Sequence, residues 1–114
     1  MPTKTKRLPT AKHGDLRVWW IPQVPMKSFN VPVANLVEAR LLMNVLAEYD
    51  AFQFDNNIKP DYSNAGGLSV FDTTDKHDGP DGSWVDWYSE DGDEIDNYTI
   101  KQLRENPPTW QDQN

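Results

Sequence analysis

The hydrophobic and polar positions of the first third of the chain predict two strands. Residues 16–21, LRVWWI, are dense in β-branched and aromatic side chains, which is typical of a strand. Residues 29–33 alternate between apolar and polar positions, and this period of two predicts a second strand. Pro32 has no amide hydrogen to give to a neighbouring strand, so we place this second strand at the periphery of a sheet.

A helical period follows over residues 36–50, and we expect the helix to continue slightly beyond that range. Asn35 and Glu38 have the spacing of a helix N-cap and its capping-box partner. On a helical wheel the apolar residues occupy one broad arc, which we expect to lie against a sheet. That arc consists of Leu36, Ala39, Leu42, Met43, Val45, Leu46, Ala47 and Tyr49, and it faces away from Arg40, Asn44 and Glu48.

The next segment is polar and contains Gly66 and Gly67, which we expect to form a turn because glycine adopts positive φ at little cost. Two short apolar runs, residues 68–71 and 84–88, predict two further strands. The loop between these runs is too polar and too rich in glycine to be buried.

Residues 90–93 predict a turn with Asp-Gly at its centre, and residues 98–105 can form a short helix that stops at two prolines. The order β-β-α-β-β predicts an α+β fold, with a small antiparallel sheet covered on one face by one main helix. A chain of 114 residues fits one domain. We assign that domain to residues 15–105, with a flexible basic arm over 1–14 and a flexible tail over 106–114.

Composition excludes several kinds of site. Cysteine is absent, so the chain has no disulfide, no thiolate metal ligand and no cysteine nucleophile. No apolar run approaches the roughly 20 residues of a membrane span, and the N-terminal residues lack the apolar segment of a signal peptide. We therefore expect a soluble intracellular protein that needs no membrane.

Charge is distributed very unevenly along the chain. Residues 1–17 carry five basic side chains against one acidic one, whereas residues 72–96 carry ten acidic side chains against Lys76 alone. The net charge is −7. An acidic body repels phosphate, so direct nucleic-acid binding is expected, if anywhere, only from the basic arm. This distribution favours electrostatic choice of a protein partner.

Tryptophan side chains are a second candidate feature of a binding surface. Trp19 and Trp20 are neighbours in a predicted strand and must point to opposite faces, as must Trp84 and Trp87. One ring of each pair is therefore either packed under another segment or exposed as an anchor for a partner. The candidate partner-binding residues are Glu90, Asp91, Asp93, Glu94, Asp96, Trp20 and Trp87.

The sequence contains little that supports a catalytic function. The two histidines, His13 and His77, have no nucleophile motif beside them, and no phosphate-binding glycine motif is present. We therefore expect no enzyme, no catalytic residues and no cofactor. The weak candidates for a metal site are the oxygen- and nitrogen-bearing side chains of one loop, Asp75, His77, Asp78 and Asp81.

Three segments carry a resemblance to a known family: LRVWWIPQVPMKSFNVPV, EARLLMNVLAEYDAFQFDNNIKPDYSNAGGL and WVDWYSEDGDEID. Over residues 16–96 the chain resembles a family of small, functionally uncharacterised proteins encoded in bacteriophage and prophage genomes. The resemblance implies a small protein made inside an infected bacterium. It would act in the host cytoplasm, or in the virion, by binding a host or phage macromolecule.

The leading functional hypothesis is a non-enzymatic phage protein that binds a host or phage protein through an acidic surface flanked by aromatic residues. One version is a nucleic-acid mimic, in which carboxylates imitate phosphates. The alternatives are a virion structural or assembly protein, and a small metal-dependent enzyme that uses the loop carboxylates and His77. The sequence leaves open the partner's identity, the oligomeric state and the order of the strands.

Overall fold

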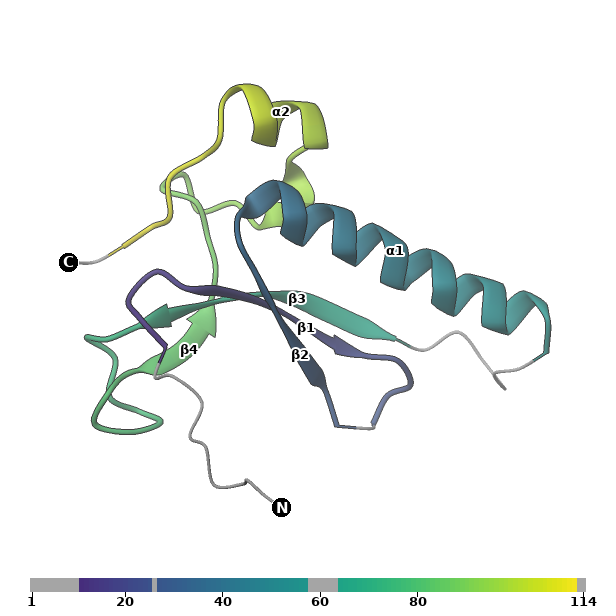
Figure 1. Cartoon of the computed structure of the whole chain (residues 1–114), viewed down its shortest axis with the longest axis horizontal. Coiled ribbons are helices and arrows are strands. Elements are labelled where there is room, and N and C mark those ends of the chain that lie inside the picture. The colour runs from purple at the N-terminus through teal and green to yellow at the C-terminus, as the bar shows by residue number, and fades with distance from the viewer. Residues whose placement is uncertain (1–10, 26, 58–63, 113–114) are drawn as a thin grey trace, which may run out of the picture.

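The computed structural model describes residues 11–25, 27–57 and 64–112. Four strands form one antiparallel sheet in the order β2-β1-β3-β4, and the main helix lies across one face of it, as Figure 1 shows. The predicted α+β fold is confirmed. In chain order the elements are β1 (Leu16–Ile21), β2 (Phe29–Val33), α1 (Leu36–Asp55), β3 (Ala65–Asp72), β4 (Ser83–Asp86), the 3-10 helix η2 (Ile95–Asn97) and α2 (Ile100–Glu105).

Helix α1 begins where the capping signal predicts. Asn35 Oδ1 accepts a hydrogen bond from the Glu38 N–H at 2.8 Å, which satisfies one of the amide donors left open at a helix start. The helix continues to Asp55, five residues beyond the predicted end at residue 50. It stops where the backbone N–H and the side-chain amide of Asn56 both donate to the Phe52 carbonyl, at 3.1 and 2.8 Å.

The face that α1 turns to the sheet is narrower than the predicted arc. Ala39 and Met43 are buried, whereas Val45 is 60% exposed and Tyr49 is 57% exposed. The assignment of Val45 and Tyr49 to the sheet-facing arc is therefore wrong. A single sheet covers only one side of a helix, and the broad apolar arc extends past that side.

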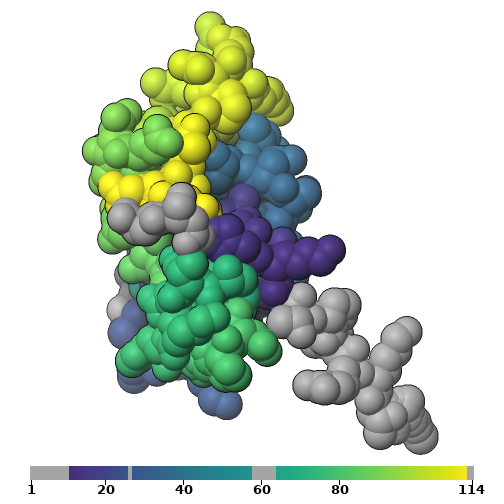
Figure 2. Space-filling model, turned by 90° about the vertical axis from the view of Figure 1, so that its left-hand side faces the viewer, coloured from purple at the N-terminus to yellow at the C-terminus, as the bar shows by residue number. Residues whose placement is uncertain are grey.

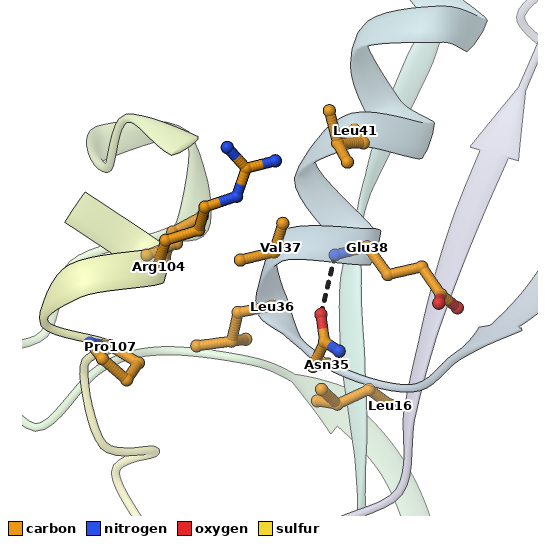
Figure 3. A pocket seen from close by; sticks show the side chains of 9 residues that line it. Leu16, Asn35, Leu36, Val37, Glu38, Leu41, Arg104 and Pro107 are labelled. Atoms are coloured by element: carbon orange, nitrogen blue, oxygen red, sulfur yellow. Dashed lines mark hydrogen bonds between the residues drawn. The ribbon is translucent and has the colours of Figure 1, made fainter. Parts of the chain in front are cut away.

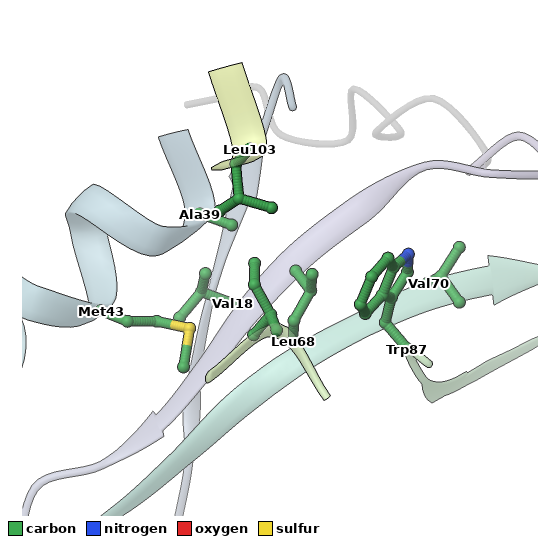
Figure 4. Packing of buried hydrophobic residues seen from close by; sticks show 8 residues of the cluster. Val18, Ala39, Met43, Leu68, Val70, Trp87 and Leu103 are labelled. Atoms are coloured by element: carbon green, nitrogen blue, oxygen red, sulfur yellow. The ribbon is translucent and has the colours of Figure 1, made fainter. Parts of the chain in front are cut away.

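One cluster of buried side chains joins the sheet to the helices (Figure 4). The register of β1 and β3 sets Val18 opposite Leu68, and both point to the face that α1 covers. Trp87 enters the same cluster from the residue that follows β4. The cluster consists of Val18, Ala39, Met43, Leu68, Val70, Trp87, Ile95 and Leu103.

Gly66 and Gly67 lie inside β3, and the prediction of a turn there is wrong. Neither has positive φ. Gly66 pairs with Trp20, and a Cβ atom on Gly66 would lie 2.1 Å from Trp20 Cε3. A Cβ on Gly67 would lie 2.8 Å from Nε1 of Trp19. These positions need glycine because two indole rings lie against the strand, one on each face.

The last predicted elements are present with shifted boundaries. Strand β4 ends at Asp86 and not at residue 88, although the Trp87 N–H still donates to the Leu68 carbonyl at 3.0 Å. Helix α2 begins at Ile100 because Thr99 is its N-cap. Thr99 and Gln102 form a capping box, with hydrogen bonds of 3.1 and 2.7 Å that satisfy both backbone donors.

Residues 1–10 of the predicted arm lie outside the described residues, while the remainder of the arm contacts the sheet. The Gly14 N–H donates to the Phe71 carbonyl at 2.9 Å. His13 Nε2 lies 2.8 Å from Asp112 Oδ2, and the His13 ring packs on Trp110 with centroids 5.0 Å apart. Figure 2 shows the first described residues, in purple, beside the C-terminal segment, in yellow, near the middle of the face that it presents.

The described part of the predicted tail also contacts the domain. Trp110 forms an isolated β-bridge with Ser89, and the Glu90 N–H donates to the Thr109 carbonyl at 2.9 Å. The predicted domain boundaries after residues 14 and 105 remain a prediction. The described residues just outside each boundary form hydrogen bonds with the domain.

Candidate functional site

The predicted acidic segment is a turn followed by η2, and most of its carboxylates face solvent. Gly92 adopts φ +84° at the turn, and its N–H donates to the Ser89 carbonyl at 2.8 Å. The predicted Asp-Gly turn is confirmed. Exposed carboxylates occur at Glu90, Asp91, Glu94 and Asp96.

Asp93 differs from the other acidic residues of this segment. It is half-buried, its carbonyl accepts the Ser89 N–H at 2.9 Å, and its Oδ1 accepts from Asn97 Nδ2 at 3.2 Å. These bonds tie the turn to η2, so Asp93 shapes the segment. Across the described residues, Glu90, Asp91, Glu94 and Asp96 form no salt bridge.

A cavity of about 100 Å³ lies beside this segment, at the edge of β3 where β4 ends. Asp86, Glu94 and Asp96 supply its carboxylates, and Trp19 and Trp87 supply its aromatic rings. Carboxylates from β4 and from the segment around η2 therefore lie around one hollow, whose lining is mostly polar. We call Asp86, Glu90, Asp91, Glu94 and Asp96 the acidic surface.

Among the residues that the structure describes, no strand pairs with this edge of β3 beyond the end of β4. The β3–β4 ladder ends at the pair Ser69 and Asp86, with the bond between Trp87 and Leu68 just beyond it. In a strand the N–H and C=O of alternate residues point to the same side. Gly66, two residues before Leu68, therefore directs its backbone groups toward the cavity edge.

Trp20 and Trp87, two of the candidate partner-binding residues, are core residues. They are 6% and 3% exposed, so they do not form a surface for a partner. The rings on the other face of the sheet are Trp19 and Trp84, both half-buried. Arg17 lies over the Trp84 ring, 4.2 Å from its centroid.

Asp86 and Trp19 were not among the predicted partner-binding residues. Asp86 shares a sheet face with Trp84, which the period of two indicates, but its proximity to Glu94 depends on how the chain leaves β4. The sequence leaves open whether Trp19 or Trp20 points to the core. Only the pairing of β1 with β3 decides between them.

Asp50 is a buried carboxylate that the sequence pattern did not single out. It is 2% exposed, and its Oδ2 accepts hydrogen bonds from Trp20 Nε1 at 2.8 Å and Asn64 Nδ2 at 2.9 Å. A buried carboxylate requires such donors. Asp50 therefore fixes the Trp20 ring between α1 and the sheet.

The loop candidates for a metal site do not converge. Asp75 Oδ1 accepts the His77 N–H at 2.9 Å, and Ser83 Oγ joins the Asp78 N–H to the Asp75 carbonyl. Over residues 11–25, 27–57 and 64–112, no group of three or more acidic or histidine side chains could hold a metal ion. The polar groups of this loop are used to fold it.

Two charged groups near this loop have shifted pKa values. The Thr74 hydroxyl donates to Asp72 Oδ1 at 2.7 Å and is the main cause that holds the pKa of the Asp72 carboxyl below its usual value. Burial lowers the pKa of the Arg17 guanidinium, and the charge of Asp78 partly offsets this. Both groups are charged near neutral pH and do not form a reactive acid–base pair.

A larger groove of about 640 Å³ separates the start of α1 from α2, as Figure 3 shows. Leu36, Val37 and Leu41 line it from α1, and Leu103 and Arg104 line it from α2. The groove is mostly apolar. No described helix has the length and hydropathy that a membrane span requires.

Comparison with known proteins connects this structure to a phage family. Residues 15–106 match the model of the family described as "Superinfection exclusion gene product 17". The chain is 58% identical over 80 residues to the superinfection exclusion protein of Salmonella phage P22, in a match that covers 66% of this chain and 78% of the relative. No solved structure matches the chain. These findings confirm the resemblance to small phage-encoded proteins, and the chain belongs to the superinfection exclusion gene product 17 family.

Proposed function

We propose that this protein acts in superinfection exclusion, without catalysis, by binding a host or phage protein through the acidic surface. The observation that carries the proposal is the group of exposed carboxylates around the cavity at the edge of β3. Family membership supports this biological process, since the P22 relative is described as a superinfection exclusion protein.

The electrostatics favour a partner with a basic segment. Exposed carboxylates steer a positively charged surface toward them and repel nucleic acid. Trp19, beside the carboxylates of Asp86 and Glu94, offers a partly apolar contact next to the charges. A charged rim around an aromatic group is a common arrangement at protein–protein interfaces.

A catalytic role for the loop carboxylates is less well supported. A metal-dependent enzyme would need Asp75, His77, Asp78 and Asp81 to point at one position. They form no ligating cluster in the described parts of the chain, and Asp75 is bonded within its own loop.

Charge reversal tests the proposal in cells. The triple variant Glu90→Lys, Asp91→Lys and Glu94→Lys replaces three attractions with three repulsions. Each attraction lost and each repulsion gained costs roughly 0.5 kcal/mol. The binding free energy should therefore become less favourable by about 3 kcal/mol, which weakens binding about 100-fold. We expect phages excluded by the wild-type protein to plate normally on a Salmonella strain that produces the variant.

A matched control changes the net charge equally at other exposed sites: Asp78→Lys, Asp81→Lys and Glu105→Lys. We expect this control to exclude phages as the wild type does, with both variants shown to be folded by circular dichroism. Exclusion that survives the first triple variant would contradict the proposal. Exclusion lost only in the control would favour the enzymatic alternative, because Asp78 and Asp81 are among the loop carboxylates that a metal-dependent enzyme would use.

A further inference from the structure

The outer face of α1 carries a continuous apolar stripe. Leu41, Val45, Tyr49 and Phe52 are 43%, 60%, 57% and 58% exposed. At 100° per residue these four side chains fall within an arc of about 80° on the helix. Single exposed apolar residues are ordinary on a protein surface, whereas four on one helical arc indicate a contact surface. We call these residues the α1 stripe.

The exposed charges that α1 itself carries around the stripe all have one sign. Glu38, Glu48 and Asp55 are the exposed ionisable groups of α1 besides Tyr49. Arg40 is turned away from the stripe and is half-buried, where its guanidinium donates to Asn44 Oδ1 and, at 3.4 Å, to the Tyr98 carbonyl. Along α1 itself the stripe is therefore framed by negative charge, while Arg104 of α2 is the basic residue that lines the far wall of the adjoining groove.

The α1 stripe is continuous with the groove between α1 and α2. Leu41 belongs to both, and Val37 continues the apolar surface into the groove (Figure 3). From Glu38 to Asp55 the helix is about 25 Å long. A surface of this length and shape fits a helix of about five turns laid alongside α1.

We propose that the α1 stripe and the adjoining groove form a docking surface for an amphipathic helix of a partner protein whose apolar face is flanked by lysine or arginine. The apolar faces would pack together, and the basic flanks would pair with Glu38, Glu48 and Asp55. This contact is separate from the acidic surface and does not depend on the proposed function.

Charge complementarity decides against two other occupants. In a symmetric dimer through the stripe, each copy would bring Glu38, Glu48 and Asp55 against the same acidic residues, with no exposed basic residue of α1 to offset them. An anionic lipid surface attracts amphipathic helices flanked by lysine or arginine, and α1 has the opposite charge.

A synthetic peptide tests the docking surface. The probe is an 18-residue helical peptide with leucine on one face and lysine at the flanks, labelled for fluorescence anisotropy. Its control has the same leucines with glutamate at the flanks. We expect the full-length protein to bind the lysine peptide at least 10-fold more tightly than the glutamate peptide.

The variant Val45→Ser with Phe52→Ser should weaken binding of the lysine peptide at least 10-fold. Val24→Ser with Tyr88→Ser, which removes two exposed apolar side chains elsewhere, should leave it unchanged. The Glu90→Lys, Asp91→Lys and Glu94→Lys protein should still bind, which separates this surface from the acidic surface.

Equal binding of both peptides, or binding unaffected by Val45→Ser with Phe52→Ser, would overturn the proposal. A dimer in analytical ultracentrifugation that disappears with Val45→Ser and Phe52→Ser would assign the stripe to a second copy instead. Binding to phosphatidylglycerol vesicles that is lost with the same substitutions would assign it to a lipid surface.

Discussion

Trp20→Ala is expected to lower the free energy of unfolding by about 4–6 kcal/mol, most of what a small domain has. Removing a buried tryptophan side chain costs about 3–5 kcal/mol through lost burial and the cavity left behind. The substitution also takes away the donor that lies 2.8 Å from Oδ2 of the buried Asp50, which adds about 1 kcal/mol or more. Urea denaturation followed by far-UV circular dichroism measures the change.

Trp20→Phe separates the two contributions. Phenylalanine keeps an aromatic ring between α1 and the sheet but has no N–H for Asp50, so we expect a loss of about 1–3 kcal/mol. If Trp20→Ala were no more destabilising than an ordinary surface substitution, at most about 0.5 kcal/mol, Trp20 would not be the core residue that its 6% exposure indicates.

Gly66→Ala should destabilise the protein by about 3 kcal/mol, although alanine adds only one methyl group. The new Cβ would lie 2.1 Å from Trp20 Cε3, far inside van der Waals contact, so the ring or the strand must move. Gly79→Ala is the matched control. Gly79 has no atom within 4 Å of its Cβ position and no positive φ, so the change there should stay within about 0.5 kcal/mol.

A double variant identifies the ring as the cause. Trp20→Leu removes the ring atoms that a Cβ on Gly66 would meet, so Gly66→Ala should cost much less in that background, and the two effects should not add. If the same loss appeared with and without the indole ring, the cost would belong to the glycine backbone and not to its contact with Trp20.

The local signals in the sequence predicted the elements well. Both N-terminal strands occupy the predicted residues, and α1 starts after Asn35 as its capping signal indicates. Gly66 and Gly67 were assigned wrongly because glycine serves equally in a turn and beneath a large ring. Only the pairing of β1 with β3, a contact between residues about 46 apart in the chain, distinguishes the two.

The candidate site was predicted less completely, because it also depends on contacts between residues far apart in the chain. Charge along the chain located Glu90, Asp91, Glu94 and Asp96, because like charges close in sequence stay close in space. Asp86 joins them only through the folded path from β4 to η2. The exposed side of α1 was not foreseen, since the helical wheel assigned Val45 and Tyr49 to the core.

The most direct measurement is affinity capture from a lysate of the bacterial host, at low and high salt, with mass spectrometry of the retained proteins. A partner held by the acidic surface should be retained at low salt and lost at high salt. It should be absent with the Glu90→Lys, Asp91→Lys and Glu94→Lys protein and present with the Asp78→Lys, Asp81→Lys and Glu105→Lys control. Capture that is empty at both salt concentrations, or a partner retained equally by both variants, would contradict binding through the acidic surface.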